Sequence, residues 1–334
     1  MTTTEQLDSA RAHDDVRTRR GASGWLFGLA VVATVGLLVL SLTVGVYDIT
    51  GSEDGWRMFA ITRVPRTISL VLAGAAMSMC GLLMQLLTQN RFVEPTTTGT
   101  TEWAGLGLML VYLLSPGASI FVRMLGAIAM AFLGTFVFFL FLRRVALKSS
   151  LIVPIVGIMM GSVVGAVSSY IALRFDMLQQ LGIWFAGSFT SVVRGRYELL
   201  WIVLIVTVVV FIVADRFTVA GLGKDIATNV GVDYDRVILL GVAMVSIATG
   251  VVTVVIGSLP FLGLVVPNIV SMIRGDNLRG NLPWVCLLGI AVVTLCDLIG
   301  RTIIQPFEVP VSLILGVFGA VFFVFLVLWQ QRRA

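Results

Sequence analysis

Residues 63–105 read RVPRTISLVLAGAAMSMCGLLMQLLTQNRFVEPTTTGTTEWAG, and this stretch decides the fold. From Ile68 to Leu87 it contains no charged residue over about twenty positions. That length is enough to cross a bilayer core of roughly 30 Å at about 1.5 Å per residue. The stretch therefore predicts a membrane-spanning helix followed by a polar, threonine-rich loop.

One face of this helix carries small and polar side chains. They recur every three or four residues, which gathers them into one narrow stripe. Small and hydroxyl side chains let helix backbones approach closely, and a glutamine amide in hydrocarbon needs a partner or water. We assign the stripe to a transport pathway, with close helix packing as the alternative. Its members are Gly74, Ser78, Gly81, Gln85 and Thr88.

The composition is typical of a polytopic membrane protein. Hydrophobic residues make up 58% of the chain and charged residues 12%, whereas soluble domains carry roughly 25% charge. The net charge of +5 comes from scattered basic residues rather than a basic stripe, which argues against nucleic-acid binding. No polar linker divides the apolar runs, so a single transmembrane domain is predicted at 25–331. We expect the polar residues 1–24 to form a disordered cytoplasmic tail.

Ten apolar runs predict an all-α bundle of about ten transmembrane helices. The weakest run contains Gly263 and Pro267, so its broken helix must be covered by protein or water. If both termini are cytoplasmic, most of the 23 lysines and arginines fall in cytoplasmic segments, as the positive-inside rule requires. The runs are 25–46, 68–87, 103–114, 120–142, 151–173, 199–214, 237–256, 261–273, 284–299 and 309–329.

Two motifs resemble the signatures of one family. Residues 63–67 (RVPRT) precede the small-residue helix, residues 89–100 (QNRFVEPTTTGT) follow it, and residues 257–268 read GSLPFLGLVVPN. These motifs are similar to those of the FecCD, or BtuC-type, permeases of ATP-driven importers. The first motif resembles the iron–siderophore branch more than the vitamin B12 branch. The resemblance covers nearly everything after Gly24.

The resemblance implies a BtuC-like fold of the type II importer class, in the plasma membrane of a bacterium. It also implies three kinds of protein partner besides the lipid bilayer. These are a pair of ATPase subunits, a second permease subunit that we expect to be a non-identical homologue, and an extracytoplasmic siderophore-binding protein.

The longest cytoplasmic loop, residues 215–236, predicts a short amphipathic helix. Gly221 interrupts the chain, apolar residues then recur every four positions, and a later glycine can cap the C-terminus. The resemblance implies that this segment docks in a cleft of the ATPase subunit. A helix on the lipid surface is the alternative, although one lysine makes a poor basic face. The coupling residues are Leu222, Gly223, Lys224, Asp225, Ile226, Val230 and Gly231.

Three arginines on the predicted outer side oppose the positive-inside bias. Arg63 and Arg66 flank Pro65 before the second span, and Arg301 ends the ninth. The resemblance implies that all three face carboxylates on the two lobes of the binding protein. The alternatives are snorkelling to lipid headgroups and, for Arg301, an ion pair with Asp297 four residues earlier.

Two features of the middle of the chain concern the pathway and helix packing. Ser149 and Ser150 follow Lys148 in a turn that matches by position the one narrowing the family's pathway, so we add both serines to the pathway. In the fifth span, two overlapping GxxxG patterns predict close packing against the second span. Those glycines are Gly157, Gly161 and Gly165.

Neither a metal site nor a cofactor is predicted. The only histidine, His13, lies in the polar tail, and the three cysteines are isolated in apolar runs, so we expect them to be free and buried. The GLGK sequence at 221–224 is not a phosphate-binding loop, because Thr218 stands where the pattern needs glycine. ATP hydrolysis is therefore expected in a separate subunit.

The sequence thus predicts a permease subunit, not an enzyme, for an importer of an iron–siderophore chelate. One alternative is a permease for another metal chelate, such as haem or cobalamin. A proton-coupled secondary transporter is the other. A proton carrier would need paired carboxylates deep in the membrane, whereas Asp176, Asp297 and Glu308 fall near the ends of spans.

Overall fold

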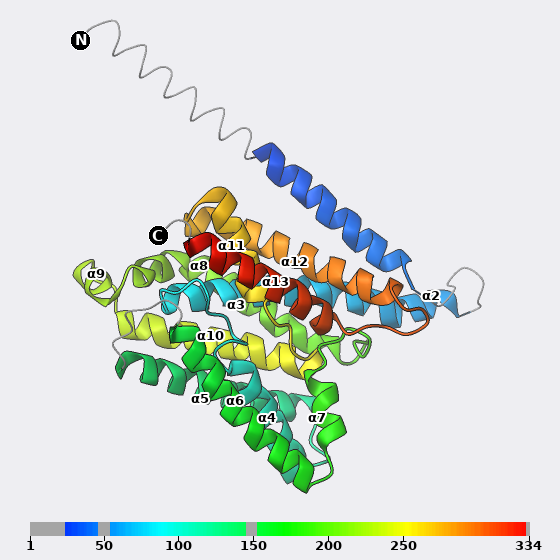
Figure 1. Ribbon diagram of the computed structural model, residues 1–334. Coiled ribbons are helices and arrows are strands. Elements are labelled where there is room, and N and C mark those ends of the chain that lie inside the picture. Colours follow the sequence, from blue (N-terminus) through cyan, green and yellow to red (C-terminus); the bar gives the residue numbers. More distant parts are fainter. Residues whose placement is uncertain (1–23, 46–53, 145–151, 332–334) are drawn as a thin grey trace, which may run out of the picture.

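The protein is built from helices in the part that the computed structural model describes, residues 24–45, 54–144 and 152–331 (Figure 1). The predicted tail lies outside this part except for Gly24, and the predicted pathway residues Ser149 and Ser150 lie outside it altogether.

Ten apolar helices in the described residues coincide with the ten predicted runs. Eight of these segments are long and apolar enough to cross a membrane, and two are shorter. The long segments are the N-terminal helix Gly24–Thr43; Gly55–Leu87, which comprises α2 (Gly55–Met58), a π-helical turn (Phe59–Arg63) and α3 (Val64–Leu87); α5 (Ile120–Arg144); α6 (Ile152–Arg174); Tyr197–Gly221, which includes α8 (Trp201–Gly221); α10 (Tyr234–Val255); α12 (Leu278–Thr302); and α13 (Val311–Gln331). The shorter helices are α4 (Thr100–Leu114) and α11 (Leu262–Arg274).

Two further short helices lie outside the predicted runs. Helix α7 (Leu178–Phe185) falls in a segment for which no helix was predicted, and α9 (Lys224–Asn229) falls in the predicted coupling loop. That loop is shorter than expected, because α8 continues to Gly221. Helix α9 lies at one end of the bundle and α2 at the other (Figure 1). We call these the α9 end, predicted to be cytoplasmic, and the α2 end, predicted to be extracytoplasmic.

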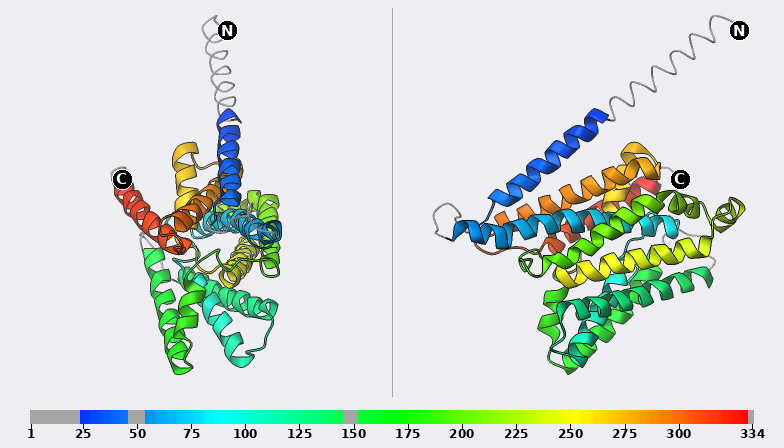
Figure 2. Two further views of the ribbon diagram at one scale, coloured as in Figure 1. Left: turned by 90° about the vertical axis from the view of Figure 1, so that its right-hand side faces the viewer. Right: turned by 180° about the vertical axis from the view of Figure 1, so that it is seen from behind.

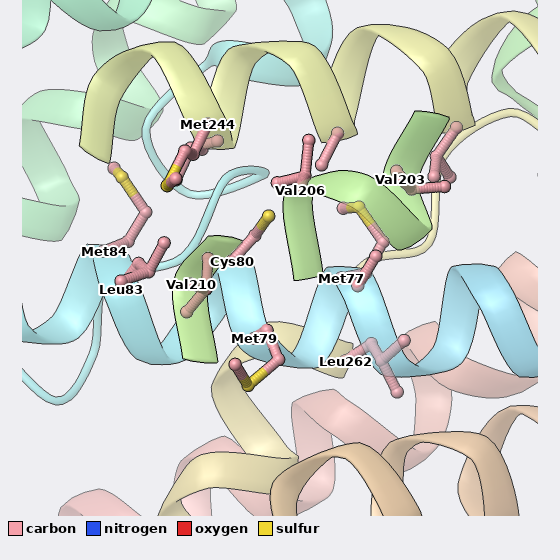
Figure 3. Close-up of a cluster of buried hydrophobic side chains, with 14 of the residues drawn as sticks. Met77, Met79, Cys80, Leu83, Met84, Val203, Val206, Val210, Met244 and Leu262 are labelled. Carbon is pink, nitrogen blue, oxygen red and sulfur yellow. The ribbon is translucent and has the colours of Figure 1, made fainter. Parts of the chain in front are cut away.

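Helix α3 lies at the centre of the bundle and contacts α8, α10, α11 and α12. Most of the apolar part of the segment Gly55–Leu87, which contains α3, is buried. By contrast, most of the N-terminal helix is exposed, and this helix diverges from the bundle (Figure 2). Met79, Cys80 and Met84 have almost no exposed surface and lie among side chains of α8, α10 and α11 (Figure 3). The stretch that opened the sequence analysis is therefore the core of the fold.

A proline follows the π-helical turn and frees one backbone carbonyl within it. Proline has no amide hydrogen, so Pro65 leaves the carbonyl of Ile61, four residues earlier, without its helical partner. The amide of Arg194 donates to that carbonyl at 3.0 Å. The freed backbone group thereby ties the loop after α7 to the start of the central helix.

The GxxxG glycines of α6 were predicted to pack against α3, but two of them contact a loop instead. A Cβ atom on Gly157 would lie 2.3 Å from the carbonyl oxygen of Thr97, and one on Gly161 would lie 3.1 Å from Cα of Gly99. The close contact is therefore with the threonine-rich loop that follows α3. Close backbone packing at these glycines is therefore present as predicted. Its partner is a loop, which the spacing of the glycines in the sequence does not reveal.

Candidate functional site

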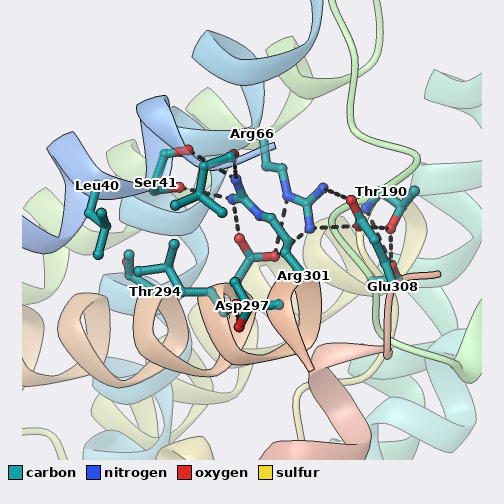
Figure 4. Close-up of polar contacts among 12 residues, drawn as sticks. Leu40, Ser41, Arg66, Thr190, Thr294, Asp297, Arg301 and Glu308 are labelled. Carbon is teal, nitrogen blue, oxygen red and sulfur yellow. Dashed lines mark hydrogen bonds and ion pairs between the residues drawn. The ribbon is translucent and has the colours of Figure 1, made fainter. Parts of the chain in front are cut away.

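Two arginines and two carboxylates meet at the α2 end of the bundle (Figure 4). Nη2 of Arg66 lies 2.7 Å from Oδ1 of Asp297 and 2.9 Å from Oε2 of Glu308. The hydroxyl of Thr190 donates to Glu308 at 2.6 Å. The side chain of Asp297 has no exposed surface, and a carboxylate this deep is tolerated only when it is paired and hydrogen-bonded.

Arg301 completes this cluster and is only 5% exposed. Its guanidinium donates to Asp297, and also to the carbonyls of Ser41 at 2.9 Å and Val44 at 3.2 Å. Arg63 donates to the neighbouring carbonyls of Leu42 and Thr43, at 3.0 and 2.8 Å. The last carbonyls of a helix lack intrahelical partners and carry partial negative charge. These two arginines therefore cap the N-terminal helix from α12 and from the turn before α3.

The three arginines predicted for docking do come together. They line one cavity of about 250 Å³ with Thr190 and Glu308. The ion pair between Arg301 and Asp297, named above as the alternative, is present. With its guanidinium buried and bonded within the chain, Arg301 is poorly placed to meet a carboxylate of another protein. Docking through Arg63 and Arg66 stays a prediction.

The charge state of this cluster follows from its geometry. Burial alone would raise the pKa of Glu308, but the hydrogen bonds and positive charge of Arg66, with the Thr190 hydroxyl, lower it overall. Glu308 is therefore ionised at neutral pH and balances Arg66 together with Asp297. Neither Glu308 nor Thr190 was named with the predicted arginines. Asp297, a carboxylate inside an apolar run, was the signal that buried cations lie nearby.

The two signature motifs interlock toward the α9 end of the bundle. Glu94 accepts hydrogen bonds from the amides of Phe261 at 2.7 Å and Leu264 at 3.1 Å, the first backbone groups of α11. Asn268 of α11 donates in return to the carbonyl of Arg91 at 2.8 Å. Glu94 thus acts as the N-terminal cap that the sequence around α11 lacks, because Phe261 has no capping oxygen.

Burial raises the pKa of Glu94 to about 7, although its hydrogen bonds with Thr96 and with backbone amides at the start of α11 lower it. The ordinary value is 4.5, so between these two values the folded protein binds more protons than the unfolded chain. Stability contributed by Glu94 is therefore greatest at low pH and falls as the pH rises through about 7.

We predict that Glu94→Gln destabilises the protein, because the side-chain NH₂ group of glutamine cannot accept a hydrogen bond and would face one of the two amides that donate to Glu94. Leaving a buried amide without its acceptor costs about 1–3 kcal/mol. Thermal unfolding of purified wild type and variant should show a gap in Tm that is larger at pH 5 than at pH 8. A gap that is absent at both pH values would contradict the capping role.

The stripe on α3 is covered by neighbouring helices in this structure. A Cβ atom on Gly81 would lie 2.0 Å from the carbonyl oxygen of Gly263 in α11, and one on Gly74 would lie 2.9 Å from that of Gly289 in α12. A Cβ atom on Gly289 would in turn lie 2.1 Å from Oγ of Ser78. The stripe is thus a packing seam, the alternative left open above, and its pathway role stays a prediction.

Gln85 has a specific partner in this seam. Pro267 leaves the carbonyl of Gly263, four residues earlier in α11, without its helical donor. The side-chain amide of Gln85 donates to that carbonyl at 3.2 Å. A glutamine in an apolar helix thereby satisfies a backbone group freed by a proline in the neighbouring helix, as a broken helix in a membrane requires.

The predicted coupling segment forms the short helix α9. Its C-terminus is capped as predicted by Gly231, whose φ is +81°. The amide of Gly231 donates to the carbonyl of Thr228, and that of Val232 donates to the carbonyl of Ala227. This pair of bonds defines a Schellman motif. The coupling residues Gly223, Lys224 and Asp225 begin the helix, and Nζ of Lys224 lies 3.4 Å from a carboxylate oxygen of Asp235.

The apolar face of this segment is open. Leu222, Ile226 and Val230 are 59%, 49% and 62% exposed, although all three are large and hydrophobic. Such a patch on a loop that leaves the bundle marks an interaction surface.

The three cysteines are free, as predicted. Cys80 and Cys296 are buried, and Cys286 is half-buried.

A profile of the FecCD transport family matches residues 26–329. The chain belongs to the FecCD transport family. This FecCD chain is 58% identical over 306 residues to the petrobactin import system permease protein FatD of Bacillus anthracis, and the match covers 92% of each chain. It is 38% identical over 274 residues to the ferric-anguibactin transport system permease protein FatD of Vibrio anguillarum, covering 82% of this chain and 87% of that one.

The fold of the FecCD chain is also that of a solved transporter. A structure described as an inward-facing conformation of a metal-chelate type ABC transporter matches with a TM-score of 0.77 at 22% sequence identity. The match covers 90% of this chain and 98% of that one. At this level of identity the likeness supports the fold alone. The predicted family and the predicted helical membrane fold are confirmed.

Proposed function

We propose that this FecCD chain is the permease subunit of an ABC importer that carries a ferric siderophore into a bacterial cell. The similarity to permeases for petrobactin and ferric anguibactin, which extends over nearly the whole chain, carries this proposal. Substrate class is a property of the assembled pathway, and relatives aligned at this level share the helices that line it. The termini and α9 lie in the cytoplasm, and the α2 end faces outward.

The exposed face of α9 meets the ATPase subunit in this proposal. Helix α9 is joined to α8 through residues 222–223 and to α10 through residues 230–233, and both α8 and α10 pack against the central helix α3. A displacement of α9 when the ATPases close therefore reaches the centre of the bundle through two rigid elements. ATP hydrolysis belongs to those separate subunits.

The pathway is completed by a second permease subunit, which we take to be a non-identical homologue. Ser149, Ser150 and the α3 stripe are the proposed pathway residues of this chain. Because the stripe is covered by α11 and α12 here, its use requires these helices to separate from α3 during transport.

The experiment that tests the function uses vesicles reconstituted with the permease, its ATPases, the second permease and the binding protein. The cargo is a ferric siderophore labelled on both the metal and the organic ligand. We expect ATP-dependent accumulation of both labels in equal amounts. Parallel vesicles are offered haem or cobalamin. Accumulation of one of these, without accumulation of the siderophore, would assign another chelate as the cargo. ATP-independent uptake driven by a proton gradient would refute an ABC importer.

We predict that Arg63→Glu weakens docking of the binding protein. The effect should be strongest at low salt, since exposed charges are screened over about 10 Å at 0.1 M. Arg66 is left unchanged, because its replacement would also break its ion pairs with Asp297 and Glu308 inside the protein. Binding of the binding protein to immobilised complex, measured across salt concentrations, checks this.

The matched control for this prediction is Arg57→Glu, which changes the same charge on the exposed helix α2 at the same end. An equal loss in both variants would reduce the effect to general attraction between the two surfaces. Unchanged binding in Arg63→Glu would leave Arg63 with only its role at the end of the N-terminal helix.

A further inference from the structure

A groove separates the N-terminal helix from α11 and α12 near the α9 end of the bundle. It encloses about 330 Å³ and is lined by residues 26–37 of the N-terminal helix, 269–274 of α11 and 284–291 of α12. This volume falls at the lower end of the roughly 300–1,000 Å³ typical of ligand sites. None of the sites described above uses this groove.

The wall of the groove is almost entirely hydrocarbon. Leucine, isoleucine, valine and alanine supply most of the lining. The one hydroxyl among them, that of Thr34, donates to the carbonyl of Ala30 in its own helix at 2.8 Å. An occupant therefore gains from burial of apolar surface and finds no polar partner along most of the length.

The length of the groove matches one leaflet of a membrane. From Leu26 to Leu37 the N-terminal helix rises about 16 Å at about 1.5 Å per residue, and half of a bilayer core is about 15 Å. The length of the groove therefore matches that of an extended hydrocarbon chain in one leaflet.

One end of the groove is cationic and aromatic. Arg274 ends α11, and its guanidinium carbon lies 4.7 Å from the ring centre of Trp284. The Trp284 ring also contacts Phe27 edge to face, at 5.1 Å between centroids. Tryptophan and arginine at this depth are typical of the interface with headgroups, and a guanidinium presents donors that match phosphate oxygens.

We propose that this groove binds one anionic phospholipid from the leaflet at the α9 end. An acyl chain lies along the N-terminal helix, and the phosphate of the headgroup meets Arg274. The lipid fills the space that separates the N-terminal helix from the bundle. This helix is also held by the contact between Phe27 and Trp284 at the same end, and by Arg63 and Arg301 at its opposite end. The proposal does not depend on the identity of the transported cargo.

The test measures lipid bound to the full-length chain purified in mild detergent. Native mass spectrometry counts bound lipids during titration with phosphatidylglycerol or with phosphatidylcholine of the same acyl chains. Two variants change the groove, Ala33→Phe by filling it and Arg274→Gln by removing the cation. Two controls change the same chemistry outside it, Val32→Phe on the exposed face of the same helix and Arg144→Gln at the exposed end of α5.

We expect one tightly held phosphatidylglycerol per wild-type chain. Arg274→Gln should weaken the binding of phosphatidylglycerol about fivefold, because one basic residue near an anionic surface contributes about 1 kcal/mol. The binding of phosphatidylcholine should not change. Ala33→Phe should weaken the binding of both lipids. The two control variants should bind both lipids as the wild type does.

Three results would overturn the proposal. The first is retention of phosphatidylglycerol by Ala33→Phe at the wild-type level. The second is an equal loss in Arg274→Gln and Arg144→Gln, which would indicate diffuse attraction. The third is a change of oligomeric state in Ala33→Phe without loss of lipid, which would assign the groove to a protein interface. Unfolding curves of each variant show whether a loss of lipid reflects a loss of fold.

Discussion

Replacing Leu222 or Ile226 by aspartate is expected to abolish transport while the protein still inserts and folds. Both side chains are exposed in the free chain, so a charge there costs the fold little. In contact with the ATPase the same carboxylate would be buried against an apolar surface, at a cost of about 2 kcal/mol or more. Binding of the ATPase should therefore weaken about thirtyfold or more, since each 1.4 kcal/mol is about tenfold.

Co-purification of the ATPase with the tagged permease measures this loss directly, with uptake as a second readout. The control is Thr228→Asp, which adds the same charge to the same exposed helix on its opposite side. If α9 instead lies on the lipid surface, the aspartate variants will retain the ATPase at the wild-type level, and the coupling assignment fails.

Gly81→Leu is expected to prevent the helical bundle from assembling. The first atom of any side chain at this position would lie 2.0 Å from the carbonyl oxygen of Gly263, which is backbone and cannot turn aside. Overpacking of well-packed cores commonly costs about 1–3 kcal/mol, and a backbone clash in the central helix exceeds that range. The yield of monodisperse protein in size-exclusion chromatography should fall to a small fraction of the wild-type yield.

Gly165→Leu provides the matched control. Gly165 also lies in a membrane helix, but a Cβ atom there would meet nothing within 4 Å. This variant should give the wild-type yield. If Gly81→Leu also folds with the wild-type Tm but fails to transport, the packing account is wrong and the stripe belongs to the pathway.

The sequence by itself determined the class of the protein, the positions of the ten apolar helices and the form of α9, but not the short helix α7. These properties depend on local composition and on neighbours a few residues apart. Uncharged runs of sufficient length must cross the membrane. The coupling helix stops before Gly231, because the chain turns there with a positive φ that glycine adopts readily. Its open apolar face also followed from spacing, since Leu222, Ile226 and Val230 recur every four residues.

Only the tertiary structure decided what the unusual polar residues do. The side chains of Arg66 and Asp297 are bonded across 231 positions of sequence, and those of Gln85 and Glu94 reach α11 across 178 and 167 positions. Each was visible as a polar group in an apolar chain. From the sequence, Arg66 was assigned to a docking surface, Gln85 to a pathway and Glu94 to a loop, while Asp297 was named as an alternative partner of Arg301. In a membrane a buried polar group must find a partner within the protein. Which partner it finds depends on which helices are neighbours, and neighbouring helices are chosen by packing of the whole bundle.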